Sequence, residues 1–434
     1  MPPNPSSPTH FLPEINVPKF FAEAPSLALG RYGGLLIEFV LTDGAEEENL
    51  RQLTPEQRTI FYFDIIWGQV DNGGFVQLFG NGYGKYLSPA IEGLRALGEP
   101  DMADLFLRAE KEYRKNWWQF LKAKLRGWRG WFNPAFYAGQ GGLDALDEEF
   151  YRTKSGTIAR LVALVRSTGS RYFTAQNGQT YREDTSGTLE GFYRAGELQS
   201  RGTFHQGQLH GTYEEYFSGG ALKASAQYER GGLVETKIQN EQGKLTKTRS
   251  QTGEPGVWRE VSYREDGSCY YGLCDQDGNK VAGPTGGQYP NGQVSREGYQ
   301  DERGYSVGEV KEYYPDGKPK LIGEYIGRFT LGVQQFWLPG GEQTLKDGNG
   351  YRLVELKLRE GVEVLREEYQ DGVKHGEVKR SREGVPTLVE NYHAGKLHGP
   401  RKQFYPNGSP KQIAHYEQGQ LVSKQDFPED SEGA

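Results

Sequence analysis

A unit of 24 residues recurs in the second half of this chain of 434 residues, and it constrains the fold more than any other feature. Counted from Phe204, glycine stands at offsets +3, +7 and +16, and an aromatic residue stands at +12 and +24. The same offsets recur from Tyr392, and from position 301 except that Asp301 replaces the first aromatic residue. A period of this length indicates stacked repeats, in which each unit is stabilised by its neighbours.

Asn-Gly and Asp-Gly pairs indicate that each repeat is a β-hairpin. Such pairs supply two residues with positive φ in a tight turn, and they occur here at Asn291-Gly292, Asp316-Gly317 and Asn407-Gly408. We expect the aromatic residues at +12 and +24 to stack on their counterparts in the next hairpin, on one face. The sequence therefore predicts an elongated antiparallel sheet over residues 167–425.

The first half has the pattern of a helical domain. Only 18 of the 60 glycines lie in residues 1–166. Thr54-Pro55-Glu56-Gln57 combines an N-cap hydroxyl, a proline at the first helical position and a glutamine at the third, and Pro100-Asp101 is a further start signal. The predicted fold is α+β, with an N-terminal all-helical domain followed by a C-terminal elongated antiparallel β-sheet of hairpin repeats. The predicted divisions are an N-terminal extension at 1–44, a helical domain at 45–166, a repeat domain at 167–425 and an acidic tail at 426–434.

A basic, tryptophan-rich run in the helical domain has two interpretations. Trp118, Leu121, Leu125 and Trp128 are spaced 3, 4 and 3 residues apart, which places them on one helical face. This spacing favours an amphipathic helix packed on the core, with its lysines reaching to solvent. The interleaved aromatic and cationic residues would also suit single-stranded nucleic acid, but we favour core packing.

The sequence has no constellation typical of an enzyme. Six of the seven histidines lie inside the repeats, and His210, His375 and His398 occupy the same +6 position, which favours a role in the scaffold. We find no nucleophile elbow and no phosphate-binding loop. The two cysteines, Cys269 and Cys274, are expected to be reduced and structural. We therefore predict no catalytic residue, no metal site and no cofactor.

Charge and hydropathy point to a cytoplasmic protein. The formal net charge is -7; residues 1–104 hold 14 acidic and 6 basic residues, whereas residues 105–131 hold 8 basic and 2 acidic residues. No window approaches the roughly 18 apolar residues of a bilayer span, and the first twenty residues lack the pattern of a signal peptide. We expect neither membrane association nor direct nucleic-acid binding.

Both halves resemble known families. The segment YHAGKLHGPRKQFYPNGSPKQIAHYEQG is similar to the MORN-variant repeats of YwqK-type antitoxins, a resemblance that covers about residues 190–425. Residues 45–155 resemble the bacterial DNA-mimic-protein family, and LDALDEEFYR at 143–152 is a further similarity. The central Asn-Gly-Gly-Phe-x-Gln signature of that family, with a following asparagine, is matched by Asn72, Gly73, Gly74, Phe75, Gln77 and Asn81.

These resemblances imply a protein that works by binding another protein. The leading hypothesis is a bacterial immunity protein, or antitoxin, that blocks the active cleft of a cognate cytoplasm-acting toxin, such as a secreted nuclease or another effector. The alternative is a DNA-mimic-type regulator that binds a transcription factor or nucleoid protein. The oligomeric state stays open. The candidate partner-binding residues are Glu46, Glu47, Glu48, Asp71, Asn72, Gln77, Asn81, Asp101 and Asp104. For the three amides we prefer another role, capping the turn between two helices.

Overall fold

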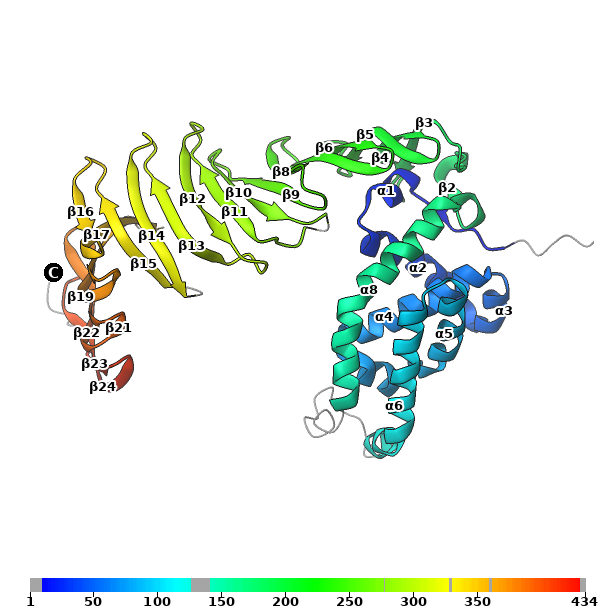
Figure 1. Cartoon of the computed structure of the whole chain (residues 1–434), viewed down its shortest axis with the longest axis horizontal. Coiled ribbons are helices and arrows are strands. Elements are labelled where there is room, and N and C mark those ends of the chain that lie inside the picture. Colours follow the sequence, from blue (N-terminus) through cyan, green and yellow to red (C-terminus); the bar gives the residue numbers. More distant parts are fainter. Residues whose placement is uncertain (1–9, 126–140, 277, 328–329, 359–360, 430–434) are drawn as a thin grey trace, which may run out of the picture. The chain divides into compact units, whose positions relative to one another are not determined.

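The computed structural model describes residues 10–125, 141–276, 278–327, 330–358 and 361–429 (Figure 1). Contacts divide the chain into two compact units, residues 1–244 and residues 245–434. The first unit holds the helices and the first hairpins, and the second is an array of strands. The predicted α+β fold is therefore confirmed. Residues 430–434 of the predicted acidic tail lie outside the described residues.

The helices start where local sequence signals place them. At the start of the longest apolar run, Thr54 Oγ1 accepts from the Gln57 N–H at 3.1 Å, and Gln57 Oε1 accepts from the Thr54 N–H at 2.9 Å. This reciprocal capping box satisfies two N–H groups that the first turn leaves free. The described helices are α1 (Val17–Ala22), α2 (Pro25–Leu41), α3 (Glu46–Arg51), α4 (Pro55–Gly80), α5 (Leu87–Ala96), α6 (Pro100–Leu125) and α8 (Gly141–Ser167), with the short 3₁₀ helix η2 (Tyr83–Tyr86).

The segment predicted as an N-terminal extension contains part of the helical core. Leu29 and Leu36 on α2 are fully buried in the same apolar cluster as Ile60 on α4. The short strand β1 (Glu14–Ile15) pairs in parallel with β2 (Thr174–Ala175), which follows α8. Residues 10–44 are therefore built into the helical fold.

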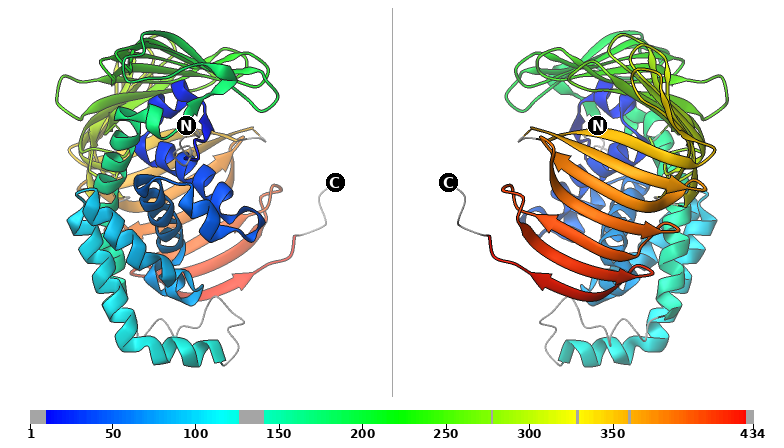
Figure 2. Two further views of the ribbon diagram at one scale, coloured as in Figure 1. Left: turned by 90° about the vertical axis from the view of Figure 1, so that its right-hand side faces the viewer. Right: turned by 90° about the vertical axis from the view of Figure 1, so that its left-hand side faces the viewer.

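Within each unit the repeats form antiparallel strands that pair with their neighbours along the chain. Figure 2 shows the later strands of the second unit lying side by side. In the first unit the strands are β3 (Gly187–Phe192), β4 (Leu198–His205), β5 (Gln208–Tyr216), β6 (Leu222–Glu229) and β7 (Gly232–Gln239). In the second unit they are β8 (Leu245–Gln251), β9 (Trp258–Tyr263), β10 (Cys269–Cys274), β11 (Gly283–Gln288), β12 (Val294–Gln300), β13 (Ser306–Tyr313), β14 (Pro319–Gly327), β15 (Thr330–Trp337), β16 (Gln343–Lys346), β17 (Asn349–Leu358), β18 (Gly361–Gln370), β19 (Val373–Arg382), β20 (Val385–His393), β21 (Lys396–Leu397), β22 (Gly399–Phe404), β23 (Pro410–Glu417) and β24 (Gln420–Asp426). Strand β20 also pairs with β22.

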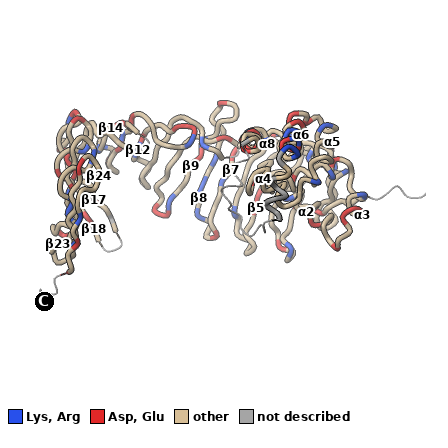
Figure 3. The backbone as a smooth tube through the Cα atoms, turned by 90° about the horizontal axis from the view of Figure 1, so that it is seen from below, with Lys and Arg blue, Asp and Glu red and all other residues tan. Residues whose placement is uncertain are grey.

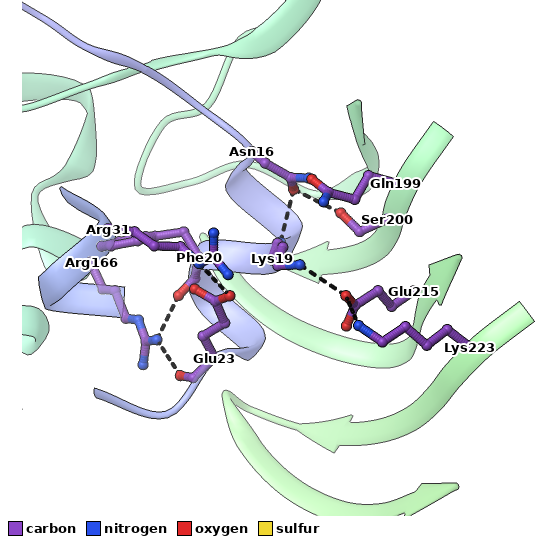
Figure 4. A network of polar contacts seen from close by, with 10 residues as sticks. All are labelled: Asn16, Lys19, Phe20, Glu23, Arg31, Arg166, Gln199, Ser200, Glu215 and Lys223. Carbon is purple, nitrogen blue, oxygen red and sulfur yellow. Dashed lines mark hydrogen bonds and ion pairs between the residues drawn. The ribbon is translucent and has the colours of Figure 1, made fainter. Parts of the chain in front are cut away.

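The compact units divide at a different place from the predicted domains because α1 joins the first hairpins to the helices. Lys19 Nζ lies 2.8 Å from a carboxylate oxygen of Glu215 on β5 (Figure 4). On the other side of α1, Arg166 of α8 donates to the carbonyl oxygens of Phe20 and Glu23 at 2.6 and 2.8 Å. Strands β3–β7 therefore belong to the same unit as the helical bundle.

Two kinds of turn alternate in the repeats, and one of them differs from the prediction. In the Tyr-Pro-Asn-Gly turn at 289–292, only Gly292 has a positive φ, and its N–H donates to the Tyr289 carbonyl at 2.9 Å. Proline suits the negative φ of the second turn position, and the geometry is that of a type I turn followed by a left-handed glycine. Two positive φ angles occur instead in the other turns, as at Gln418-Gly419. The two-positive-φ geometry predicted for the Asn-Gly and Asp-Gly pairs is therefore wrong.

Tyrosine hydroxyls link several neighbouring repeats. Tyr289 Oη donates to the Tyr313 carbonyl at 2.8 Å, and Tyr314 Oη donates to the Trp337 carbonyl at 2.6 Å. The same link joins Tyr193 to Tyr216 in the first unit and Tyr405 to Phe427 near the end of the array. Backbone carbonyls at +12 positions, such as those of Tyr216 and Tyr313, thus accept a hydrogen bond, where we expected the aromatic rings to stack.

The recurring histidines also serve the scaffold. The Nδ1 atoms of His210, His375 and His398 accept from backbone N–H groups 19 or 20 residues further on, at 3.3 to 3.4 Å. Each donor belongs to a residue with a positive φ in the next tight turn, such as Gln418. The scaffold role predicted for these histidines is confirmed.

The tryptophan-rich run departs from its prediction. Trp118 is 58% exposed and its ring stacks on Trp117 with 4.1 Å between centroids, so its predicted burial in the core is wrong. The buried side chains described on α6 all lie in its first three turns, where the helix contacts α5 and α8: Met102, Ala103, Leu105, Phe106 and Ala109. Trp128 lies outside the described residues.

Candidate protein-binding groove

The Asn-Gly-Gly-Phe signature forms a break inside α4. Gly74 has φ +71° and ψ -179°, a conformation that is essentially restricted to glycine. A Cβ atom at Gly74 would overlap the carboxylate of Asp147 on α8. The Phe75 N–H, released by the break, donates to Asp147 Oδ1 at 2.8 Å. Asp147 therefore caps the second half of α4, and burial raises the pKa of its carboxyl to about 6.

Phe75 anchors this break in the core. Its ring is fully buried and lies edge-on to Phe106 and Phe150, with centroids 6.2 and 6.1 Å away. Phe150 comes from the LDALDEEFYR segment that also supplies Asp147. The Asn-Gly-Gly-Phe signature and the LDALDEEFYR segment are thus in contact with each other.

Beyond the break, two of the predicted amide side chains, Gln77 and Asn81, form hydrogen bonds with a further amide, Gln69. Gln77 Nε2 and Asn81 Nδ2 both donate to Gln69 Oε1, at 3.3 and 2.9 Å. Gln77 is buried and Asn81 is exposed. These contacts join side chains and give the two amides a structural role within the domain, whereas the predicted capping of the turn stays a prediction.

A groove of about 510 Å³ lies between α2 and α4, and Gln69 is part of its wall. Asp64, Gly68 and Asp71 face it from α4, since residues four and three apart share a helical face. Gly30 of α2 and Gly68 both have open space where a Cβ would stand. The remaining lining residues are Ile37, Leu41, Ile65, Trp67 and Tyr83. The groove therefore combines apolar and aromatic walls with a carboxylate toward each end.

Asp64 is the most perturbed acid of this groove. Burial raises the pKa of its carboxyl to about 7, and the only cause of the shift is the loss of water. The carboxyl is pressed against α2: a Cβ atom at Gly33 would come within 2.6 Å of Asp64 Oδ2. A carboxylate held in this way gains most from a cation that enters the groove, because the cation favours its charged form.

Asp71 is fixed at the other end of the groove. It accepts from Trp67 Nε1 at 2.6 Å and pairs with Lys154 of α8. The Trp67 indole is thus held by the carboxylate two residues from the break in α4. An indole face next to carboxylates is a typical environment for an arginine or lysine side chain.

The predicted acidic triplet lies on α3, where Figure 3 colours the backbone of acidic residues red. Glu46 is half-buried; it accepts from Tyr86 Oη at 2.8 Å and lies 3.1 Å from Lys85 Nζ. Glu47 and Glu48 are exposed, and Glu47 lies 3.8 Å from Arg51. Tyr86 is in ring contact with Tyr83, the aromatic end of the groove. Glu46 is therefore engaged with η2 beside the groove.

The remaining candidates lie elsewhere on the helical surface. Asn72 is exposed at the break in α4, next to Asp71. Asp101 is exposed in the first turn of α6, and Asp104 pairs with Arg95 of α5 at 2.8 Å. The structure thus gathers Asp71, Gln77 and Asn81 around the groove, whereas Asp101 and Asp104 lie on α6, away from its lining.

Sequence reasoning missed Asp64 and Asp147. Asp64 interrupts the apolar run IFYFDIIW, and a lone acid in such a run is a signal for a buried carboxyl with a local role. Asp147 lies in the LDALDEEFYR segment, but its contact with Phe75 spans 72 residues of sequence. Only the folded chain brings these two positions together.

Comparisons with known proteins support both resemblances. Residues 51–168 match the sequence profile of the DMP19-like protein family, and residues 306–326 and 397–418 match the MORN repeat variant. The two predicted resemblances are confirmed. A search of curated proteins gives no match.

Among solved structures, the chain is similar to a porin-like protein from Bacteroides uniformis, with 10% identity over 52% of this chain and 87% of that chain. The TM-score of 0.15 is too low to carry an argument. Among the described residues, none of the helices has both the length and the apolar character that crossing a membrane requires.

Proposed function

We propose that this protein is a bacterial immunity protein, or antitoxin, that binds a cognate toxin in the cytoplasm and blocks its active cleft. The groove between α2 and α4 carries this proposal. It offers the buried Asp64 carboxyl, the paired Asp71 and the Trp67 indole to one incoming side chain. An arginine or lysine of the toxin fits that environment best, since the Asp64 carboxyl and the indole face attract a cation.

The charge of the helical domain supports the same kind of partner. Residues 1–104 carry 14 acidic and 6 basic residues, so this part of the chain attracts a basic surface. Long-range attraction of this kind raises the association rate, and close contacts then slow dissociation. A nuclease or another enzyme with a basic substrate channel is the proposed target, inhibited by occlusion of that channel.

Co-expression with the toxin encoded next to this gene tests the proposal. The wild-type protein is expected to restore growth and to co-purify with the toxin. Asp64→Asn keeps the size of the side chain and removes its charge, so the affinity is expected to fall about tenfold or more, which corresponds to roughly 1.4 kcal/mol or more.

The matched control is Asp184→Asn, which removes an exposed carboxylate far along the sequence from the groove. It is expected to bind the toxin like the wild type. If the wild-type protein neither restores growth nor co-purifies, the immunity function is refuted; if Asp64→Asn binds like Asp184→Asn, the groove is not the contact.

A second candidate is the DNA-mimic-type regulator, which the match of residues 51–168 to the DMP19-like family favours. Its partner would be a transcription factor or nucleoid protein, and duplex DNA would compete for the same partner surface. Binding that disappears in moderate salt and in excess duplex DNA would favour this candidate. A toxin bound equally well in the presence of DNA would favour the immunity function.

A further inference from the structure

Strands β12, β13 and β14 expose an apolar row that their fold does not require. Tyr299, Val307 and Ile326 are 58%, 40% and 59% exposed. Tyr299 and Val307 are directly paired, and Ile326 lies beside Val307 because the preceding residue, Tyr325, pairs with Gly308. Residues opposite each other in an antiparallel pair share a face. The three side chains therefore form one continuous row, here called the apolar ridge.

The opposite face of these strands supplies the core. Val310 and Leu321 are 2% exposed and belong to the apolar cluster of the second unit. Because side chains alternate along a strand, the apolar ridge points away from that cluster. Burial in the core therefore does not explain the apolar ridge.

Other repeats in this chain place polar residues at the same positions. The +6 position of Val307 is histidine in the repeats of His210, His375 and His398. The residue after the +24 aromatic, Ile326 here, is Glu229 after Tyr228 and Glu417 after Tyr416. The hairpin fold thus accepts polar side chains at these positions. An exposed apolar group where the scaffold tolerates a polar one is typical of a contact surface.

Acidic residues border the apolar ridge on the same face. Glu309 and Glu324 are directly paired across β13 and β14, although like charges in this arrangement destabilise a sheet. Glu297 lies two residues before Tyr299 and is exposed, and its carboxylate accepts from Tyr313 Oη at 2.7 Å. Lys311 pairs with Glu309 at 2.8 Å. Three carboxylates and one lysine leave this border negative.

A pocket opens at the end of the apolar ridge. It has a volume of about 430 Å³, and Val307 and Ile326 form part of its wall. The longer turn at 301–305 closes one side, with Asp301, Arg303 and Tyr305. A pocket of this size beside an exposed apolar row can receive one large side chain of a partner.

We propose that the apolar ridge and its acidic border form a docking surface for a protein segment in which an apolar side chain is flanked by lysines or arginines. The apolar side chain enters the pocket beside Ile326, and the basic residues lie against Glu309 and Glu324. The identity of the partner as the toxin rests on the proposed function; the chemistry of the segment rests on the ridge itself.

Two pairs of substitutions test the two parts of this surface. Val307→His introduces the residue found at the same position in other repeats, and Ile326→Gln introduces an uncharged residue of the size of Glu229 and Glu417, so the hairpins are expected to fold. Glu309→Gln with Glu324→Gln removes the paired charges and keeps the shape. Leu421→Glu on β24 is the control, because Leu421 is also an exposed apolar residue.

The first probe is a nine-residue peptide with a central leucine flanked by arginines, measured against the full chain by calorimetry, with a peptide of the same length flanked by glutamates as reference. The wild-type protein and Leu421→Glu are expected to bind the basic peptide and not the reference. The apolar pair of substitutions is expected to weaken binding at least tenfold. The charge pair is expected to weaken it less and to flatten its dependence on salt.

The second probe is the toxin co-expressed with each variant. If the basic peptide binds the ridge but no toxin is neutralised, the docking surface stands and the immunity function fails. If the toxin is neutralised and all variants bind peptide and toxin like the wild type, the docking surface is refuted while the immunity function stands.

Two further outcomes would also overturn the inference. If the basic peptide does not bind the wild-type protein, the proposed segment chemistry is wrong. Sedimentation of the full chain gives the other outcome: a dimer that the apolar pair of substitutions dissociates would assign the ridge to a contact between copies of this chain.

Discussion

The backbone N–H of Phe75 donates to the carboxylate of Asp147 at 2.8 Å, and this bond joins the two most distinctive sequence segments of the helical domain. The break at Gly74 leaves the Phe75 N–H without a partner in the helix, and the Asp147 carboxylate accepts its hydrogen bond. Because Phe75 and Phe150 also touch, the two segments are fixed by one polar and one aromatic contact. The Asn-Gly-Gly-Phe signature is thus explained as a requirement of the fold next to the groove.

Replacing Gly74 with alanine is expected to destabilise the helical unit by at least about 2 kcal/mol. The new Cβ would be forced into a glycine-only backbone region and against Asp147. Thermal unfolding followed by tryptophan fluorescence checks this. Gly68→Ala is the control, since Gly68 is helical and has open space at its Cβ position; it should be neutral or stabilising by up to about 1 kcal/mol. Equal melting temperatures for the two variants would contradict this account of the break.

Asp147→Ala is expected to cost about 1 to 3 kcal/mol, because it leaves the Phe75 N–H without its acceptor. Asp147→Asn retains an acceptor oxygen at the same place and is expected to be at least as stable as the wild type at pH 7.5. Urea unfolding of the three proteins gives the comparison. The cap is refuted if the alanine and asparagine variants are equally stable.

Asp64 is expected to make stability fall as pH rises. Its pKa is about 7 in the folded protein and near its ordinary value of 3.8 when the chain unfolds. Between about pH 4 and pH 7 the folded state keeps a proton that the unfolded chain has released, so the unfolding free energy decreases with pH and levels off above about 7. The contribution is about 2 kcal/mol, allowing for the part of the carboxyl that solvent reaches. The measurement is the difference between wild type and Asp64→Asn across this window, which a constant difference would contradict.

Ala394→Asn is expected to stabilise the second unit by about 0.5 to 1 kcal/mol. Ala394 has φ +47° in a tight turn, a conformation that asparagine adopts more readily than alanine. Its backbone N–H keeps the bond to His375 in either case. Ala282→Asn, at an exposed position without a positive φ, serves as the control. A lower melting temperature for Ala394→Asn than for Ala282→Asn would show that the positive φ of Ala394 does not reduce the stability of the second unit.

Local signals predicted the elements of this fold well. The capping box at Thr54 and the strands of the hairpin repeats depend on residues close together in sequence, and both are present. The Tyr-Pro-Asn-Gly turns were assigned the wrong geometry because the Asn-Gly pair was read as the two central residues of the turn, whereas the glycine is its fourth residue, as it also is in the proline-free turn Arg264-Glu265-Asp266-Gly267. That error concerns two dihedral angles and leaves the hairpin itself intact.

The groove could not be predicted because it depends on two helices that approach through glycine. Asp64 becomes a buried acid only when Gly33 of α2 lies against its carboxyl. Likewise, Trp118 has the spacing of a core residue, but the fully buried side chains described on α6 lie in its first three turns. The spacing of residues in the sequence predicts which of them share a helical face. Whether that face is buried depends on the elements that pack against it, which the spacing does not show.

The tyrosine links between repeats have a consequence for how the length of this protein can change. Each hydroxyl reaches a carbonyl 22 to 24 residues ahead. Duplication or loss of one complete hairpin of about 24 residues would keep an acceptor carbonyl opposite each of these hydroxyls, so the array is expected to accept the gain or loss of whole units. Removal of half a unit would leave a hydroxyl opposite the wrong strand, so the fold is expected to tolerate changes of length in steps of one full period.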